Sequence, residues 1–292
     1  MVKIAVASGK GGTGKTFIAT NLAFSLLRNN SGTILVDCDA ETPDAVAFFD
    51  TKESGRFEVM QEIPVIDTDA CTFCGKCSEY CNYNAIFILH PVKIIQVIRD
   101  LCHGCGACTI ACKFGAITEQ AESLGHVTTY SVNGPDLIVE ARANIGVMSP
   151  VPVIKAALKR INGLPEYIIL DAPPGTSCPF VQTVAASDYV ILVTEPTPFG
   201  LSDLKLSVET LRNIDKPFGV IINRAGLGYD KVKEYLNQEN IPELLEVPFS
   251  KEIARMYSNG ELYSEKDTLF AGQLLSIGQN IVAKYGNSGY QR

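Results

Sequence analysis

The chain has 292 residues, of which 46% are hydrophobic, and it carries a formal net charge of −7 at pH 7. That length and composition suffice for one large α/β domain or two domains with real hydrophobic cores. The negative charge argues against a broad nucleic-acid footprint, and no apolar run approaches the ~18 residues that a membrane helix needs, so we expect neither nucleic-acid binding nor membrane insertion.

The start of the chain and its cysteine content both indicate a reducing compartment. Met1 leads directly into an apolar run, without the basic segment and cleavage site of an export signal. Ten cysteines without such a signal point to metal or redox chemistry and away from disulfides. We therefore expect a cytoplasmic protein.

A phosphate-binding loop follows the first predicted strand. Residues 2–7 are nearly all apolar, as in a strand covered on both faces, and residues 9–16 match the pattern G-x-x-x-x-G-K-[ST]. Glycines allow backbone N–H groups to surround an anion, while the lysine and the hydroxyl of such a loop reach the β- and γ-phosphates and Mg²⁺. The predicted nucleotide site contains Gly9, Lys10, Gly11, Gly12, Thr13, Gly14, Lys15 and Thr16.

An additional lysine near the start of this loop, Lys10, distinguishes it from an ordinary phosphate-binding loop. The sequence KGGTGKT resembles the deviant Walker A motif of the MinD/ParA/Mrp ATPase family. In that family this lysine contacts the nucleotide bound by a second subunit, whereas without the resemblance a solvated lysine is the alternative. The resemblance implies an ATPase, with slow or partner-stimulated hydrolysis, that acts as a homodimer or as a heterodimer with a related ATPase.

The next two elements are a helix and a second parallel strand. Apolar residues at 18, 22 and 26 predict a helix that ends at the polar run 29–32, and residues 33–37 (TILVD) predict the strand. Ligand groups cluster beyond the carboxyl ends of such strands. The family resembled here has a D-x-D at this point, and its second aspartate, Asp39, orients the attacking water and lies near the metal. In the iron-sulfur branch Pro-Asn follows, whereas this chain has Pro43 and Asp44.

An internal repeat of eight cysteines occupies the middle of the chain, after a predicted short strand and turn at 56–64. The template C-x2-C-G-x-C-x3-C-x3-A-I occurs at 71–86 and again at 102–117. In such runs three cysteines hold three corners of a [4Fe-4S] cluster and the fourth reaches the sister cluster. Zinc is the alternative, but structural zinc sites usually draw their ligands from separated pairs.

This segment resembles the bacterial two-cluster ferredoxins, although Asn82 and Lys113 stand where those proteins usually have proline after the fourth cysteine. The resemblance implies a crossed assignment of the ligands. One [4Fe-4S] cluster is assigned to Cys71, Cys74, Cys77 and Cys112, and the other to Cys81, Cys102, Cys105 and Cys108.

The α/β pattern resumes after Glu119. Two strands are predicted at 127–132 and 137–141, around a turn at 133–135, and a helix follows at 153–161. The buried strand 167–171 (YIILD) ends in a segment that resembles the second switch of the ATPase family. There Asp171 would hold Mg²⁺ through water, and the Gly175 amide would sense the γ-phosphate.

Two further buried strands are predicted at 189–194 and 218–223, with a helix between them. Asn223 at the end of the second strand, Arg224 directly after it, and Pro248 in the segment 247–249 match the adenine side of the family's site. A closing helix is predicted at 271–285, followed by a loose tail at 287–292.

The predicted fold is an α/β P-loop NTPase with a mostly parallel sheet, formed by residues 1–63 and 121–292. An inserted ferredoxin-like α+β domain would occupy residues 64–120. The leading hypothesis is an ATPase coupled to electron transfer through the two clusters, with a redox partner. The alternatives are a factor that assembles or delivers metalloclusters to an acceptor protein, and a MinD/ParA-like positioning ATPase with structural or sensory clusters.

Overall fold

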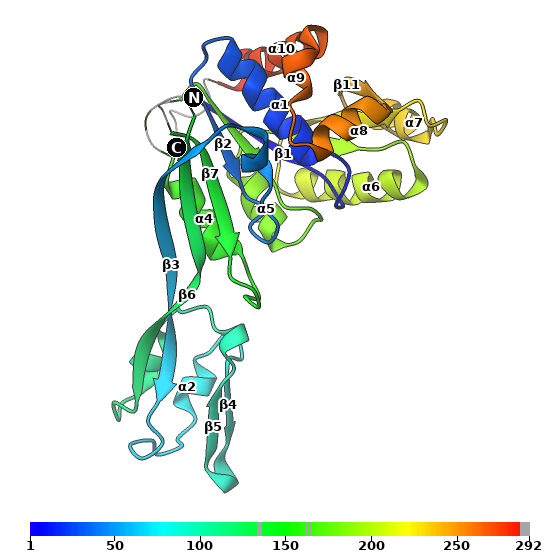
Figure 1. Cartoon of the computed structure of the whole chain (residues 1–292). Coiled ribbons are helices and arrows are strands. Elements are labelled where there is room, and N and C mark those ends of the chain that lie inside the picture. Colours follow the sequence, from blue (N-terminus) through cyan, green and yellow to red (C-terminus); the bar gives the residue numbers. More distant parts are fainter. Residues whose placement is uncertain (133–135, 162, 164, 287–292) are drawn as a thin grey trace.

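The computed structural model describes residues 1–132, 136–161, 163 and 165–286. The predicted turn at 133–135 and the predicted tail at 287–292 lie outside this range. Within it, an α/β body carries a smaller lobe on a long two-stranded ribbon (Figure 1). No helix in the described part of the chain has the length and apolarity to span a bilayer.

One nine-stranded sheet forms the frame of the body, in the order β11-β10-β9-β1-β8-β2-β7-β6-β3. The pairs from β11 through to β7 are parallel, whereas β6 pairs antiparallel with both β7 and β3. The predicted α/β fold with a mostly parallel sheet is therefore confirmed. Its strands are β1 (Val2–Ala7), β2 (Thr33–Asp37), β3 (Lys52–Ile66), β6 (Ile117–Ser131), β7 (Asp136–Ala143), β8 (Tyr167–Asp171), β9 (Tyr189–Thr194), β10 (Phe218–Ala225) and β11 (Glu243–Pro248).

Helices cover both faces of the sheet, because its central strands β1, β2, β8 and β9 are apolar along nearly their whole length and have no polar face to expose. Side chains of α1 and α10 fill one core, and side chains of α4, α5, α6 and α7 fill the other. The helices of the body are α1 (Lys15–Arg28), α4 (Val151–Lys159), α5 (Cys178–Ala185), α6 (Pro198–Asn213), α7 (Lys231–Gln238), α8 (Lys251–Ser258), α9 (Tyr263–Lys266) and α10 (Thr268–Tyr285), with a 3-10 turn at Ala45–Phe48.

The ribbon that leaves the body is longer than its sequence pattern predicts. In place of a short strand at 56–64, β3 runs without a break from Lys52 to Ile66. It pairs along its length with β6, which likewise begins well before the predicted strand at 127–132. The outward-facing side chains of β3 and β6 are exposed and include charged residues. A strand in the core of the sheet would have apolar residues at those positions. The proposed boundaries of the insertion fall opposite one another in this ladder, where Ile63 pairs with Gln120.

The lobe at the end of the ribbon is a small α+β unit. Two short helices of the two cysteine runs pack together, and a hairpin lies beside them. Ile86, Ile117, Cys77 and Cys108 form its small apolar core. The elements are α2 (Lys76–Glu79), β4 (Ile86–Leu89), β5 (Ile94–Val97) and α3 (Ala107–Ala111), with 3-10 turns at His90–Val92 and Arg99–Leu101.

Candidate functional site

The glycine-rich loop joins β1 to α1 at the carboxyl edge of the sheet. Gly14 precedes the helix with φ 96°, a conformation that side chains rarely adopt, and a Cβ there would lie 2.3 Å from the amide nitrogen of Asn223. Lys15 and Thr16 form the first turn of α1 and are buried. Their backbone N–H groups stand at the positive end of the helix dipole, which favours an anion at this point.

Asn223 and Arg224, at the end of β10, hold the backbone of this loop. The Asn223 amide donates a 2.8 Å hydrogen bond to the Thr13 carbonyl, and the Arg224 guanidinium donates to the Gly12 carbonyl at 3.0 Å. These bonds give both residues a loop-supporting role beside the adenine-side role that the family resemblance implies. Pro248 lies nearby, paired in register with Ala225.

Glu195 is a residue of this site that the sequence reasoning missed. One of its oxygens lies 2.5 Å from the Lys10 ammonium, and the other accepts a 2.9 Å hydrogen bond from Arg224. Burial opposes ionisation of Glu195, but the hydrogen bond from Lys10 and the charges of Lys10 and Arg224 hold its pKa below the usual value. The sequence does contain one signal for Glu195: it directly follows the buried strand β9, and ligand-binding groups often follow such strands.

Asp37 organises the loop that follows β2. Its carboxylate is fully buried and accepts backbone hydrogen bonds from Asp39 at 3.1 Å and from Asp44 and Ala45 at 3.0 Å. Asp39 lies within this loop, where burial raises its pKa although the charge of Lys15 opposes the rise. The structure therefore places Asp39 where the charge of Lys15 acts on it, and Asp37 holds the backbone of the loop.

A cluster of three carboxylates lies at the same edge. Ligand atoms of Asp37, Asp44 and Asp171 all lie within 4.8 Å of one another. Burial raises the pKa of Asp171 to about 7, although Lys15 and the Thr16 hydroxyl lower it. Burial and the charge of Asp171 raise the pKa of Asp37 as well. The sequence reasoning noted Asp44 only as a departure from a family pattern.

The loop between β8 and α5 also reaches the glycine-rich loop. The Gly175 N–H donates a 3.1 Å hydrogen bond to the Ser8 carbonyl, and Gly175 has φ 91°. A φ in this range suits glycine. Gly175 and Asp171 therefore flank the loop from the neighbouring strand, β8.

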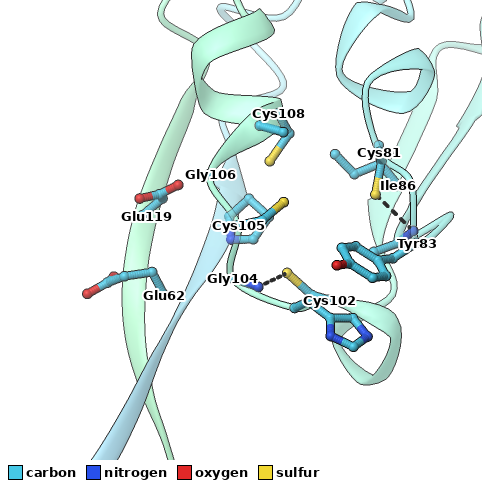
Figure 2. Close-up of a pocket in the computed structure, with 14 residues that line it drawn as sticks. Glu62, Cys81, Tyr83, Ile86, Cys102, Gly104, Cys105, Gly106, Cys108 and Glu119 are labelled. Carbon is cyan, nitrogen blue, oxygen red and sulfur yellow. Dashed lines mark hydrogen bonds between the residues drawn. The ribbon is translucent and has the colours of Figure 1, made fainter. Parts of the chain in front are cut away.

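The eight repeat cysteines gather in two pockets of the lobe. Cys71, Cys74, Cys77 and Cys112 line one pocket together with apolar side chains such as Ile66 and Phe114. Cys81, Cys102, Cys105 and Cys108 line the other, and Figure 2 shows their sulfurs directed toward a common space. Each pocket draws three cysteines from one repeat and its fourth from the other.

The surroundings of these sulfurs suit thiolate ligands of a cluster. All ten cysteines are free thiols, and backbone N–H groups of Phe73, Ala85 and Gly104 donate to the sulfurs of Cys71, Cys81 and Cys102 at 3.3 to 3.4 Å. Such N–H to sulfur contacts stabilise thiolate ligands. Burial raises the pKa of Cys77 and of Cys108, so these two thiols need a metal to ionise readily.

The remaining histidine and cysteine residues stay outside these pockets or at their margin. His103 stacks on Tyr83 at a ring separation of 3.9 Å, beside the pocket of Cys102. Cys38 is buried at the end of β2, while Cys178 is exposed at the start of α5.

Backbone contacts connect the loop after β2 to the root of the ribbon. The Ala143 N–H, at the end of β7, donates a 2.8 Å hydrogen bond to the Ala40 carbonyl, and Arg142 donates to the Pro43 carbonyl at 3.5 Å. Ala143 also pairs with Gly125 of β6, where a Cβ would lie 2.2 Å from the Arg142 carbonyl oxygen. The loop after β2 is therefore hydrogen-bonded to β7, the strand that pairs with β6 of the ribbon.

The chain is similar to several known proteins. An uncharacterized protein of Methanocaldococcus jannaschii is 31% identical over 274 residues, which cover 92% of this chain and 94% of that protein. An iron-sulfur cluster carrier protein of Aquifex aeolicus is 25% identical over 293 residues, covering 94% of this chain and 65% of that protein.

Among solved structures, MinD from Pyrococcus horikoshii complexed with Mg-ADP matches with a TM-score of 0.56 at 16% identity, over 96% of this chain and 95% of the other. A chain of the MinC:MinD cell division protein complex of Aquifex aeolicus matches with a TM-score of 0.58 at 15% identity, over 97% of this chain and 96% of the other. These likenesses show the shared fold. Residues 4–263 match the family described as the CobQ/CobB/MinD/ParA nucleotide binding domain, and the chain therefore belongs to that family.

Proposed function

We propose that the chain is an ATP-hydrolysing, dimeric nucleotide switch that controls electron transfer through two [4Fe-4S] clusters. The observation that carries this proposal is the division of eight cysteines into two four-sulfur pockets, on a ribbon that continues into the nucleotide-binding sheet. Four thiols that converge from a tight loop and a second segment suit a cubane cluster better than a pair-built zinc site. A cluster bound in each pocket would supply one-electron transfer.

In the ATPase site, each residue has a distinct role. Lys15 would bind the β- and γ-phosphates, and Thr16 with Asp171 would hold Mg²⁺. Asp39 would accept a hydrogen bond from the water that attacks the γ-phosphorus, giving ADP and phosphate. Lys10 would leave Glu195 and contact the nucleotide of the partner subunit.

The route between the two sites runs through the loop after β2. Closing this loop on ATP would move the carbonyls of Ala40 and Pro43, to which the end of β7 is hydrogen-bonded. Since β7 pairs with β6, that movement would change the setting of the lobe and the access of an acceptor protein to it. Coupling between two sites of about 1 to 3 kcal/mol would shift a one-electron potential by about 40 to 130 mV.

Anaerobic purification followed by iron, sulfide and EPR analysis tests the cluster content. Redox titration with and without MgATP, on the wild type and on Lys15→Ala, then tests the coupling. We expect an MgATP-dependent potential or electron-transfer rate in the wild type and its loss in the variant. Zinc in the pockets would refute the clusters, and unchanged potentials and rates would refute the coupling.

Delivery of clusters to an acceptor protein is the second candidate. It is favoured by the similarity to proteins described as iron-sulfur cluster carriers, in Aquifex aeolicus and in Pseudomonas fragi. Incubation with an apo-acceptor separates the two candidates. Transfer of iron and sulfide that empties this chain supports delivery, whereas reduction of an acceptor with retention of iron supports electron transfer.

A further inference from the structure

We propose that Asp37, Asp44 and Asp171 form a binding site for one small divalent cation, Mg²⁺ or Mn²⁺, that fills in the absence of nucleotide. This inference rests on the Mg²⁺ role proposed above and extends it to the nucleotide-free protein. Asp44 becomes a metal ligand, a role that neither the loop motif nor the comparisons assign to it.

The first observation is the convergence of the three carboxylates. Asp37 ends β2 and Asp171 ends β8, and these two residues are paired in register on neighbouring strands, while Asp44 lies in the loop after β2. Their ligand atoms lie within 4.8 Å of one another. An octahedral Mg²⁺ with ligands at about 2.1 Å separates opposite ligands by about 4.2 Å. A small inward movement of the exposed Asp44 would therefore complete the site.

The second observation is the state of Asp171. Its side chain is fully buried, and the Thr16 hydroxyl is close to it, yet neither of its oxygens accepts a hydrogen bond of normal distance and angle from any described residue. A buried carboxylate without partners is costly, because it loses its hydration and gains nothing in return. One of these oxygens lies within 4.8 Å of ligand atoms of Asp37 and Asp44 and is available to a cation, which is the partner that hard oxygen ligands favour.

The other two carboxylates are already positioned for the same task. Backbone N–H groups hold both oxygens of Asp37, and Oδ1, which accepts a single hydrogen bond, keeps a lone pair free. Tyr257 of α8 donates a 3.0 Å hydrogen bond to Oδ2 of Asp44, which leaves the second oxygen for the metal.

The charge balance also calls for a cation. Three ionised carboxylates whose ligand atoms lie within 4.8 Å of one another repel, and the single ammonium of the buried Lys15 cannot balance them. Mg²⁺ or Mn²⁺ supplies two further charges. When ATP arrives, its phosphates would take over ligand positions from Asp44, which would release the loop after β2.

The test uses the full-length chain, isolated anaerobically, oxidised so that its clusters are EPR-silent, and freed of nucleotide. Mn²⁺ is added, and the EPR signal of free Mn²⁺ measures what remains unbound. We expect one Mn²⁺ per chain without nucleotide. Asp44→Asn should weaken this binding at least tenfold, and Asp171→Asn should abolish it.

Asp230→Asn, at the exposed residue that precedes α7, is the control and should retain Mn²⁺ binding. Nucleotide-free binding that is absent, or equal in Asp44→Asn and wild type, would overturn the inference. If Mn²⁺ then binds only with ATP, the proposed ATPase stands without this site, whereas failure to bind ATP at all would refute the ATPase itself.

Discussion

The ammonium of Lys10 lies 2.5 Å from the carboxylate of Glu195 in the same chain. The lysine that would contact a partner's nucleotide is therefore held within its own subunit. Arg224 bonds the other oxygen of Glu195 and the Gly12 carbonyl, so the ion pair is tied to the shape of the glycine-rich loop. Dimerisation would have to exchange this contact for one across the interface.

Glu195→Gln should strengthen ATP-dependent dimerisation. Removing the negative charge frees Lys10, and a partly buried ion pair of this kind is worth about 1 kcal/mol, or about fivefold in a dissociation constant. Light scattering over a range of protein concentrations, with a non-hydrolysable ATP analogue, measures the change. Glu209→Gln, on an exposed position of α6, is the matched control. Weaker dimerisation in Glu195→Gln than in this control would show that Glu195 supports the interface.

Gly14→Ala should abolish nucleotide binding. The new Cβ would lie 2.3 Å from the Asn223 amide nitrogen, at a backbone angle of 96° that alanine rarely adopts. Accommodating it breaks the Asn223 bond to Thr13, at an expected loss of about 1 to 3 kcal/mol of stability. Fluorescent-nucleotide binding and thermal melting measure both effects.

Gly272→Ala, at an exposed position of α10, is the control, because no atom lies within 4 Å of a Cβ at that position. It should bind nucleotide nearly as well as the wild type. Equal binding by the two alanine variants would show that the loop tolerates a side chain beside Asn223.

The stability of the metal-free, nucleotide-free protein should fall as the pH rises toward 7. Burial raises the pKa of Asp171 from 3.8 to about 7, so the native chain keeps a proton that the unfolded chain has released. The stabilisation is complete below pH 3.8 and is lost as the pH passes about 7, and the raised pKa of Asp37 acts in the same direction. Chemical denaturation in the presence of a chelator, from about pH 5 to about pH 8, measures it.

Asp171→Asn should be less sensitive to pH over the same interval, since the amide does not titrate. Its melting temperature relative to the wild type should increase with pH. A constant difference between the two proteins would contradict the raised pKa of Asp171.

Single cysteine variants should each remove one cluster in a pattern that follows the pockets. Cys112→Ala and Cys71→Ala should leave the same residual EPR spectrum, and Cys81→Ala and Cys102→Ala should leave the other. Iron should fall from about eight to about four atoms per chain in each case. Cys178→Ser, outside both pockets, should keep the full content. Pairing of Cys112 with Cys102 instead would show that each repeat holds its own cluster.

The sequence predicts best the strands whose interior residues are all apolar. Residues 33–37, 167–171 and 189–194 are apolar throughout apart from the terminal residues, and the predicted strands coincide with β2, β8 and β9. The closing helix starts three residues earlier than predicted, because the Asp267 side chain caps it by accepting a hydrogen bond from the Phe270 N–H. Local patterns of this kind need no knowledge of the tertiary fold.

Contacts between distant residues were beyond that reasoning. Glu195 and Lys10 are separated by 185 positions, and no pattern near either residue predicts their ion pair. Asp44 joins Asp37 and Asp171 only because β2 and β8 are neighbours in the sheet. The ribbon was also underestimated, because most side chains of β3 face solvent and its stability comes from pairing with β6.

The opposed positions of Ile63 and Gln120 in one ladder have a consequence for the history of this chain. Ile63 and Gln120, where the predicted insertion begins and ends, share one rung of the β3–β6 ladder, so a tight turn at that rung could replace the whole cysteine-rich lobe and keep the nucleotide-binding fold. An ancestral protein could have gained this lobe by one insertion at a hairpin tip. The same rung marks where an engineer could detach the lobe or transplant it to another nucleotide-driven scaffold.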